Sequence, residues 1–409
     1  MNIFTAVRHS NDPAYYYGGL WSGNFYPALR ELGHQIVESQ VDLLPTTRFM
    51  HIKGDFTPQE LDVRAQTTEK IVAEVARAHK RKPVDVFLSY FYNAHFDPSG
   101  FDELRRLGVP SINFYCNSIY QFDYVAAIAA KADFSWHAEK NARQLYLDVK
   151  AKPVWVQMAA DPKVYRPVKD VPRSAACCFV GQRYADRDRW MAALLKADLP
   201  LAIYGPGWGA AGEAVRDGKN GHAEPTEYLG RQTPPPASLR SYMNLVADSI
   251  RDMGLAGGIS RSLRQFRYRQ ESRRLAPLFV SFAKGPIPFQ RIFEVFSSYE
   301  VILNFSNVWG DGRPGVKLIP HVRLRDFEAP MCRSCYLTGY TDEIAEFYQP
   351  EREIITYGSE PELVDKTKYY LSHPSQAEQI REAGYQRAIR DHTWVHRFTK
   401  LFSAVGLYS

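Results

Sequence analysis

The fold is decided by the stretch RLRDFEAPMCRSCYLTGYTDEIAEFYQPEREIITYGSEPELVDKTKYYLSHP, which covers residues 323–374. A cationic, amphipathic helix start carries the acid Glu328 beside the small residue Ala329. The residues that follow predict a strand at 335–340, a helix at 342–347, a strand at 353–357 and a helix that runs to Leu371. Alternation of this kind is typical of a parallel sheet with helices on its faces.

The length and composition predict a globular chain of two domains. With 409 residues the chain is too long for one ordinary core, so two domains of roughly 150–200 residues each are expected. No apolar run reaches the ~20 residues that span a bilayer, and the N-terminus turns polar early, so we expect no signal peptide. The five cysteines are an odd, sparse set, which argues against a disulfide framework and predicts a cytoplasmic location.

Strand and helix signals alternate through two halves of the chain. In the first half, NIFTAVR, HQIVES, VDVFLSYF, VPSINFY, DFSWHA and PVWVQMA read as strands with helices between them. A break rich in proline and charge at residues 159–174 predicts a linker, after which the alternation restarts. We therefore predict one domain at residues 1–165 and another at 174–391, with an arginine-rich insertion at about 210–284 in the second.

Four further motifs carry a family resemblance. They are YGGLWSGNFYPALRELGHQIV at 17–37, CFVGQRYADRDRW at 178–190, AIYGPGW at 202–208 and GPIPFQRIFEVFSSYEVILNFS at 285–306. With residues 323–374 and the late DHTWVHRF they resemble GT-B glycosyltransferases of the group-one type, and within these the CgeB-like (spore maturation protein) group. The resemblance implies an α/β fold of two Rossmann-like, doubly wound parallel-sheet domains that face a central cleft.

The resemblance also assigns a part to each domain. The N-terminal domain would bind the acceptor, and a C-terminal helix at about 392–409 would pack back on it. The glycine pair Gly18 and Gly19 would let the backbone approach a phosphate or sugar across the cleft. The C-terminal domain at 174–391 would bind the nucleotide sugar.

The donor site is expected around the phosphates of this nucleotide sugar. Arginine suits a diphosphate because its forked guanidinium makes charge-assisted contacts to phosphate oxygens. In related families two glutamates with seven residues between them hold the sugar and the ribose; Glu328 matches the second, and Pro320 occupies the place of the first. The predicted donor-binding residues are Gly181, Arg183, Arg187, Gly205, Pro288, Lys317, Arg323, Arg325 and Glu328.

No metal site or cofactor is expected. Asp186 and Asp188 form a DxD sequence, which is the metal motif of another glycosyltransferase fold. Acids at a helix start are ordinary capping and dipole partners, and GT-B enzymes as a class do not need that metal. Cys332 and Cys335 form a CxxC-like pair, but no second pair completes a zinc site.

The candidate catalytic residues are His95, Asn117 and His137, which follow three of the predicted strands. Many relatives place a histidine after the strand VPSINFY, where this chain has Cys116 and Asn117. An inverting transfer needs a base near the acceptor hydroxyl, whereas in a retaining transfer the leaving diphosphate can take the proton. Because none of these residues is a convincing base, retention is favoured.

The segment SRSLRQFRYRQESRRLAPLF at 260–279 interleaves arginines with apolar side chains. We favour a solvated face or a subunit contact over Arg261–Arg274. A helix of this composition is also typical of a peripheral contact with the inner face of an anionic membrane, near a lipid-linked acceptor. No nucleic-acid module accompanies the arginines, so nucleic acid is not an expected partner.

The resemblance implies a hexosyltransferase-like enzyme that moves a sugar from a nucleotide-diphosphate sugar to an acceptor hydroxyl. The acceptor would be a saccharide, a lipid-linked molecule or another hydroxyl compound, in the assembly of cell-surface polysaccharide, glycolipid or glycoconjugate. Two alternatives stay open: a sugar-nucleotide epimerase of the same fold, and a non-catalytic protein that binds nucleotide sugars.

Overall fold

The computed structural model describes residues 1–10, 19–209, 239–288, 291–310 and 314–408. Its internal contacts divide the chain into two compact units. Unit 1 contains Met1–Met158 and Trp394–Ser409, and unit 2 lies within residues 159–393. Among the described residues, no helix has the length and apolar content needed to cross a bilayer.

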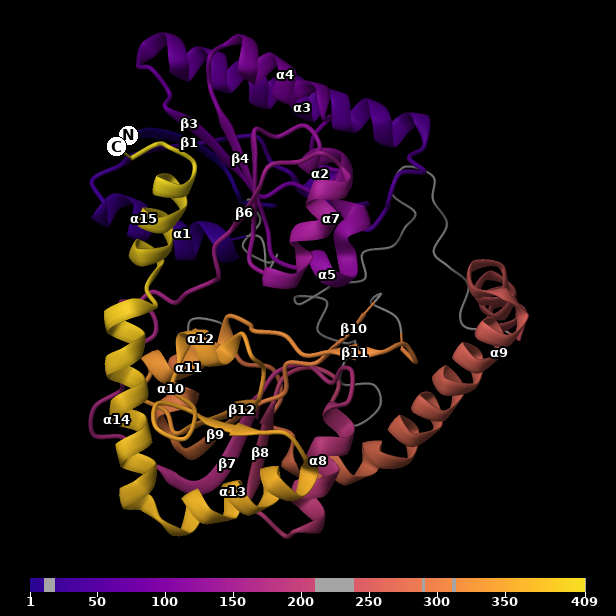
Figure 1. Ribbon diagram of the computed structural model, residues 1–409, viewed down its shortest axis with the longest axis vertical. Helices are drawn as coiled ribbons and strands as arrows, with labels where there is room; N and C mark the ends of the chain where they lie inside the picture. Colours follow the sequence, from indigo (N-terminus) through magenta and orange to yellow (C-terminus); the bar gives the residue numbers. More distant parts are fainter. Residues whose placement is uncertain (11–18, 210–238, 289–290, 311–313, 409) are drawn as a thin grey trace. The chain divides into compact units, whose positions relative to one another are not determined.

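Unit 1 is built on a parallel six-stranded sheet of order β2-β1-β3-β4-β5-β6. The inner strands β1 (Asn2–Ala6), β3 (Val86–Ser89) and β4 (Ser111–Tyr115) are buried along their whole length, as expected where helices cover both faces of a sheet. Figure 1 shows α3 and α4 on one side of these strands and α1 and α15 on the other. The remaining elements of this unit are β2 (Gln35–Glu38), β5 (Phe134–His137), β6 (Pro153–Trp155), α1 (Leu20–Glu31), α2 (Leu44–Thr47), α3 (Pro58–Arg81), α4 (Ser99–Arg106), α5 (Ser118–Gln121), α6 (Ala126–Ala129), α7 (Arg143–Asp148), α15 (Trp394–Ala404) and the short 3₁₀ turns Phe122–Tyr124 and Lys140–Ala142.

The C-terminal helix α15 packs on α1 within unit 1. The indole N–H of Trp394 donates to Asn24 Oδ1 at 2.9 Å. The rings of Trp394 and Phe398 lie edge-on to Phe25 of α1, at centroid distances of 4.9 and 5.2 Å. Aromatic contacts of this kind bury a large apolar area, so α15 is held against α1 in unit 1.

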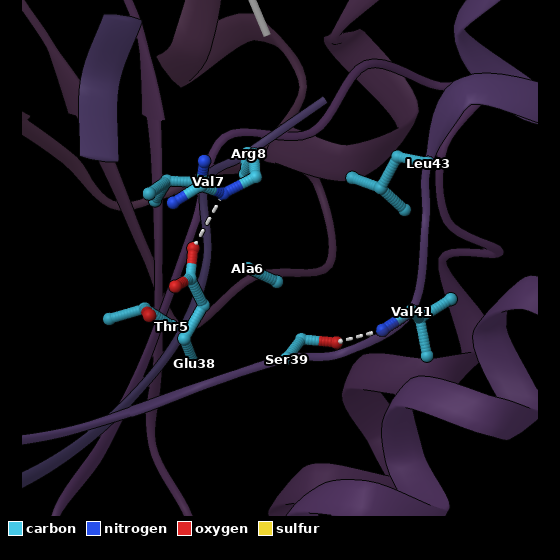
Figure 2. Close-up of a pocket in the computed structure, with 8 residues that line it drawn as sticks. All are labelled: Thr5, Ala6, Val7, Arg8, Glu38, Ser39, Val41 and Leu43. Carbon is cyan, nitrogen blue, oxygen red and sulfur yellow. Dashed lines mark hydrogen bonds and ion pairs between the residues drawn. The ribbon is translucent and has the colours of Figure 1, made fainter. Parts of the chain in front are cut away.

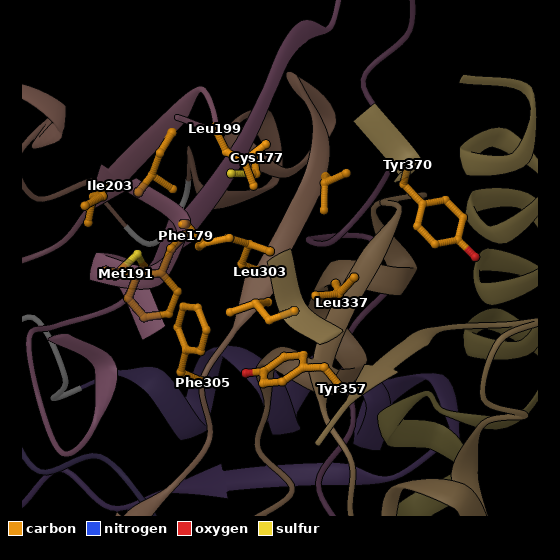
Figure 3. Packing of buried hydrophobic residues seen from close by; sticks show 14 of the residues in the cluster. Cys177, Phe179, Met191, Leu199, Ile203, Leu303, Phe305, Leu337, Tyr357 and Tyr370 are labelled. Atoms are coloured by element: carbon orange, nitrogen blue, oxygen red, sulfur yellow. The ribbon is translucent and has the colours of Figure 1, made fainter. Parts of the chain in front are cut away.

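Unit 2 is built on a parallel five-stranded sheet of order β13-β12-β9-β7-β8. Its core contains Phe179, Leu303 and Leu337 from the strands and Met191 from α8, and Figure 3 shows their side chains converging. The elements of this unit are β7 (Ser174–Val180), β8 (Leu201–Tyr204), β9 (Tyr299–Asn304), β10 (Val308–Trp309), β11 (Leu318–Ile319), β12 (Tyr336–Gly339), β13 (Ile355–Tyr357), α8 (Arg187–Lys196), α9 (Leu239–Phe279), α10 (Ile292–Ser297), α11 (Arg325–Met331), α12 (Ile344–Phe347), α13 (Glu360–Ser372), α14 (Pro374–Asp391) and the 3₁₀ turn Val280–Phe282.

The two sheets share one topology. When only the strands of the five-stranded sheet are numbered, in chain order, its order is 5-4-3-1-2, which taken in reverse matches β2-β1-β3-β4-β5 of unit 1. The predicted fold of two doubly wound parallel sheets is therefore confirmed. Residues 323–374 also form the predicted series of elements, namely α11, β12, α12, β13 and α13.

The predicted insertion contains a long helix, α9, that the alternating pattern did not specify. It bends at Gly254, whose φ of 72° and ψ of 171° are not helical. Leu275 and Phe279 near its end join the core of unit 2. Residues 210–238 of the insertion lie outside the described residues.

Candidate functional site

Each sheet has a topological switch point, where the chain leaves a first strand for one side and returns on the other. In sheets of this order, ligands bind outside the carboxyl ends of the strands at that point. In unit 2 the switch point lies between β7 and β9, and in unit 1 it lies between β1 and β3.

At the switch point of unit 2, Arg187 links the ends of the two central strands. Its Nε donates to the carbonyl of Phe305 at 3.0 Å, just beyond β9. Its Nη1 donates to the carbonyl of Gln182 at 2.7 Å, in the loop after β7. Burial, together with the positive charges of Arg323 and Arg325, lowers the pKa of Arg187 to about 10. Three guanidinium groups therefore gather here, and a bound anion would relieve their repulsion.

Arg183, also predicted to meet the diphosphate, is held by a carboxylate. Its Nε and Nη2 donate to the two oxygens of Asp188 at 2.7 and 2.6 Å. Nη2 also donates to the hydroxyl of Ser272 on α9 at 2.9 Å, and the guanidinium lies over the ring of Phe279. A bidentate ion pair of this kind is rigid. Because the same guanidinium also bonds Ser272, Arg183 connects the loop after β7 to α9.

The two glycines predicted for the donor site lie where two loops cross. Gly181 follows β7, and Gly205 follows β8 with a φ of +131°. A Cβ atom on Gly205 would lie 2.3 Å from the carbonyl oxygen of Gly181. Only a residue without a side chain lets the two loops approach this closely.

Asp326 organises the start of α11. Its carboxylate accepts from the backbone N–H of Arg323 at 2.6 Å, from the hydroxyls of Tyr336 and Thr338 at 2.8 and 3.1 Å, and from the amide of Asn304 at 3.2 Å. Burial raises the pKa of Asp326, and the four donors oppose that rise. The first turn of α11, with its arginines, is thereby fastened to the carboxyl ends of β9 and β12.

Glu328, the predicted ribose ligand, already has a partner on each oxygen. Oε1 accepts from the hydroxyl of Tyr165 at 2.6 Å, and Oε2 accepts from Nη1 of Arg325 at 2.7 Å. The side chain is 3% exposed. A carboxylate has about four lone-pair sites, so about two remain for hydroxyl donors.

Two other predicted donor residues lie on the surface of unit 2. Pro288 is exposed, and its carbonyl accepts from the N–H of Arg291 at 2.9 Å. Lys317 is exposed beside the hairpin of β10 and β11, where its carbonyl accepts from the N–H of Gly310 at 2.9 Å. The structure records a backbone role for both residues.

The acids of the DxD sequence have protein partners. Asp186 accepts from the indole of Trp190 and from the amide of Asn307, at 2.8 and 2.7 Å. Asp188 accepts from Arg183 and from Ser272. Within the described part of the chain, no group of three or more His, Cys, Asp or Glu side chains is arranged to hold a metal ion. The absence of a metal stays a prediction.

In unit 1, His95 is a fully buried residue close to the switch point. The backbone N–H of Tyr92 donates to its Nδ1 at 3.0 Å, so the proton is on Nε2. Nε2 in turn lies 3.1 Å from the hydroxyl of Thr47, which donates to the carbonyl of His9. Burial lowers the pKa of His95 well below its usual value. Both nitrogens of this candidate base are therefore engaged in holding loops together.

His9, just after β1, lies beside His95 and presents a nitrogen lone pair. Its ring is 4.2 Å from that of His95 and stacks on Tyr90 at 4.6 Å. Nε2 lies 2.6 Å from the carbonyl of Tyr90 and so carries the proton, which leaves the lone pair on Nδ1. Burial lowers the pKa of His9 to about 4, so the ring is neutral near pH 7.

The remaining residues predicted in unit 1 lie at other strand ends or beside helix α1. His137 ends β5, is fully buried, and has its Nδ1 2.9 Å from the carbonyl of Glu139. Burial lowers the pKa of His137 to about 4. Asn117 precedes α5, and Gly19 precedes α1. Gly18 lies outside the described residues.

A small cavity lies on the other side of β1, between the ends of β1 and β2. Arg8 and Tyr26 both donate to Oε1 of Glu38, each at 2.9 Å, and the volume is about 10 Å³. That space suits about one water molecule rather than a sugar. Figure 2 shows the lining residues Thr5, Ala6, Val7, Arg8, Glu38, Ser39, Val41 and Leu43.

Two residues at these sites were missed by the reading of the sequence. Asp326 sits two positions from Glu328, but its side-chain partners are 10 to 22 residues away in the chain. His9 contacts Tyr90, which is 81 residues away. The position of His9 directly after a buried strand is the signal that could have identified it.

A family model described as "Glycosyl transferase-like" matches residues 248–403. The match covers less than half of the chain, and includes the donor-site elements from α10 to α14. No curated protein matches the chain by sequence. Residues 248–403 are therefore similar to glycosyl transferase-like domains.

Solved structures resemble the chain over its whole length. A sucrose-phosphate synthase from Thermosynechococcus elongatus has a TM-score of 0.55 at 13% identity, over 100% of both chains. A glycosyltransferase from Rickettsia africae has a TM-score of 0.55 at 12% identity, over 100% of this chain and 99% of that chain. HepE from Anabaena, in complex with UDP, has a TM-score of 0.51 at 11% identity, over 100% of both chains. At these identities the likeness establishes the GT-B fold, while the CgeB-like grouping stays a prediction.

Proposed function

We propose that the chain is a glycosyltransferase that moves a sugar from a nucleotide-diphosphate sugar to an acceptor hydroxyl. The observation that carries this proposal is the gathering of Arg187, Arg323 and Arg325 at the switch point of unit 2. A diphosphate would add negative charge beside these guanidinium groups, of which Arg325 is also paired with Glu328. The GT-B fold and the glycosyl transferase-like match over 248–403 point to the same reaction.

In this proposal the arginines act on the leaving group. As the bond from the sugar to the diphosphate breaks, negative charge grows on the phosphate oxygens, and preorganised cations stabilise it. Asp326 serves as a positioning residue, because it fastens the turn that carries Arg323 and Arg325. The free lone pairs of Glu328 accept the ribose hydroxyls, while Tyr165 and Arg325 keep its carboxylate in place. Lys317 stays a proposed contact for the diphosphate.

The acceptor is assigned to unit 1. Nδ1 of His9 is unprotonated at neutral pH and can accept a hydrogen bond, because the ring is neutral there. We assign this nitrogen to a second hydroxyl of the acceptor, which it would orient, with His95 as a positioning residue beside it. We propose retention of the anomeric configuration, since the diphosphate held by the arginines can itself take the acceptor proton.

The wider context is also part of the proposal. The five cysteines are buried free thiols, which supports a reducing, cytoplasmic setting. We place the chain in the CgeB-like group of hexosyltransferases that assemble cell-surface polysaccharide, glycolipid or glycoconjugate. No metal is required, because the arginines take the part that a cation would play.

Calorimetric titration with nucleoside diphosphates tests the donor site directly. HepE was solved with UDP, with UDP and glucose, and with UDP-glucose, so UDP is the first nucleotide to try, followed by GDP and ADP. Arg323→Gln should weaken binding about 10- to 100-fold, the value of one charge-assisted hydrogen bond. Arg352→Gln, at an exposed arginine elsewhere in unit 2, is the matched control and should bind as the wild type does. No binding of any nucleoside diphosphate would contradict the proposal.

Product analysis distinguishes the alternatives. A glycosylated acceptor seen by mass spectrometry supports transfer, and NMR of its anomeric proton reports retention or inversion. Epimerised nucleotide sugar without an acceptor product would identify the chain as an epimerase. Binding of a nucleotide sugar without turnover over a broad acceptor panel would identify the chain as a non-catalytic binding protein.

A further inference from the structure

Helix α9 exposes a row of large apolar side chains. Leu255, Ile259, Leu263 and Phe266 are 67%, 45%, 53% and 54% exposed. Their spacing of four, four and three residues places them on one side of the helix, which we call the outer face. Four such side chains in a line form an apolar strip of a kind that soluble surfaces rarely leave open without use.

The opposite, inner face of α9 is already occupied by unit 2. Tyr268 packs edge-on against Trp309 with ring centroids 5.2 Å apart. Nearer the C-terminal end, the hydroxyl of Ser272 donates to Asp188 at 2.7 Å, and the ring of Phe279 packs on Trp208. These contacts hold the helix in place, and Figure 1 shows its other end standing clear of the sheet of unit 2. The outer face is therefore not needed for packing within the unit.

Arginines continue the outer face toward the C-terminal end of the helix. Arg267 lies about one turn beyond Leu263, and Arg273 and Arg274 lie about two turns beyond the apolar strip. All three are exposed, as is Arg269 on the flank. Residues 255–279 contain six arginines and one glutamate, so they carry +5 of the net +6 of the chain.

We propose that the outer face of α9 is a contact surface for an anionic lipid bilayer. The apolar strip would enter the boundary between headgroups and acyl chains, while the arginines would meet lipid phosphates. The charge argues against a second copy of the chain as the occupant, because two such faces would bring like charges together. The inference does not depend on the proposed reaction.

Co-sedimentation of the full-length protein with lipid vesicles tests this inference. The protein should pellet with vesicles that contain phosphatidylglycerol and stay in solution with vesicles of phosphatidylcholine alone. Raising the salt concentration should release it, because the attraction is partly electrostatic. Arg267→Gln/Arg274→Gln should weaken binding about 25-fold, at about fivefold for each arginine. Leu263→Ser/Phe266→Ser should weaken it at every salt concentration.

Matched controls separate the outer face from the overall charge. Arg77→Gln/Arg106→Gln removes the same charge from exposed positions on α3 and α4 and should bind vesicles as the wild type does. Unchanged thermal unfolding would show that all variants are folded. The inference is overturned if the wild type binds no vesicles, or if the α9 variants bind as tightly as the controls. Self-association without lipid that Leu263→Ser/Phe266→Ser abolishes would overturn it in favour of a second copy.

Discussion

Replacing Arg187 with methionine should remove anion affinity from unit 2 without unfolding it. Burial and the neighbouring Arg323 and Arg325 lower the pKa of Arg187 from 12.5 to about 10. At about 1.4 kcal/mol per pKa unit, holding the charge of Arg187 at this buried place costs about 3 kcal/mol. Methionine restores most of the side-chain volume without the charge.

The two hydrogen bonds of Arg187 contribute less free energy than this cost. It donates to the carbonyls of Phe305 and Gln182, and such bonds contribute about 1 kcal/mol each. The free energy of unfolding of Arg187→Met should therefore stay within about 1 kcal/mol of the wild-type value. Affinity for UDP, in contrast, should fall about 10- to 100-fold, because a charge-assisted contact to phosphate is lost.

Two measurements on the same preparation check this prediction. Urea unfolding gives the free energy of unfolding, and calorimetric titration gives the dissociation constant for UDP. Lys196→Met is the matched control, because it removes a positive charge from the far end of the same helix and should change neither value. If Arg187→Met lost more than about 3 kcal/mol of stability and bound UDP normally, Arg187 would be a structural tie and the reasoning would be refuted.

Three further predictions concern stability. Gly205→Ala should destabilise unit 2 by about 3 kcal/mol or more, since its Cβ would meet a backbone carbonyl at 2.3 Å. Gly33 also has a positive φ but has open space around it, so Gly33→Ala should lower the free energy of unfolding in urea by only about 1 kcal/mol. Equal losses for the two variants would contradict the predicted clash at Gly205. Arg183→Gln should lower the free energy of unfolding by about 3–5 kcal/mol, because it leaves the buried carboxylate of Asp188 without its ion-pair partner. The affinity of the folded fraction for UDP should stay unchanged, and a weaker affinity would show that Arg183 also contacts the nucleotide. The pKa of His137 is lowered from 6.5 to about 4, so its titration leaves the free energy of unfolding unchanged above pH 6.5 and reduces it as the pH falls to 4. His137→Gln should reduce this acid-induced loss of unfolding free energy by about 3 kcal/mol. An unaltered pH dependence would show that the histidine is not neutral when folded.

The series of elements was predictable because its signals are local. A buried parallel strand reads as a short apolar run, and a helix repeats its apolar residues every three to four positions. The elements of residues 323–374, with Glu328 on the helix at their start, follow from such signals alone. The shared strand order of the two sheets follows in turn from repeated strand-helix-strand units that cross over in the right-handed sense.

What only the tertiary structure decided is which side chains meet. Arg183 and Arg187 look equivalent in the sequence, but one is paired with Asp188 and the other faces two more arginines. His9 carried no motif, and its place beside His95 depends on strands far apart in the chain.

The same distinction applies to α9. Its helical period is readable in the sequence, whereas the side that faces inward depends on Tyr268 meeting Trp309. Charge, burial and hydrogen bonding act through space, so the chemistry of a site emerges only when distant segments are brought together.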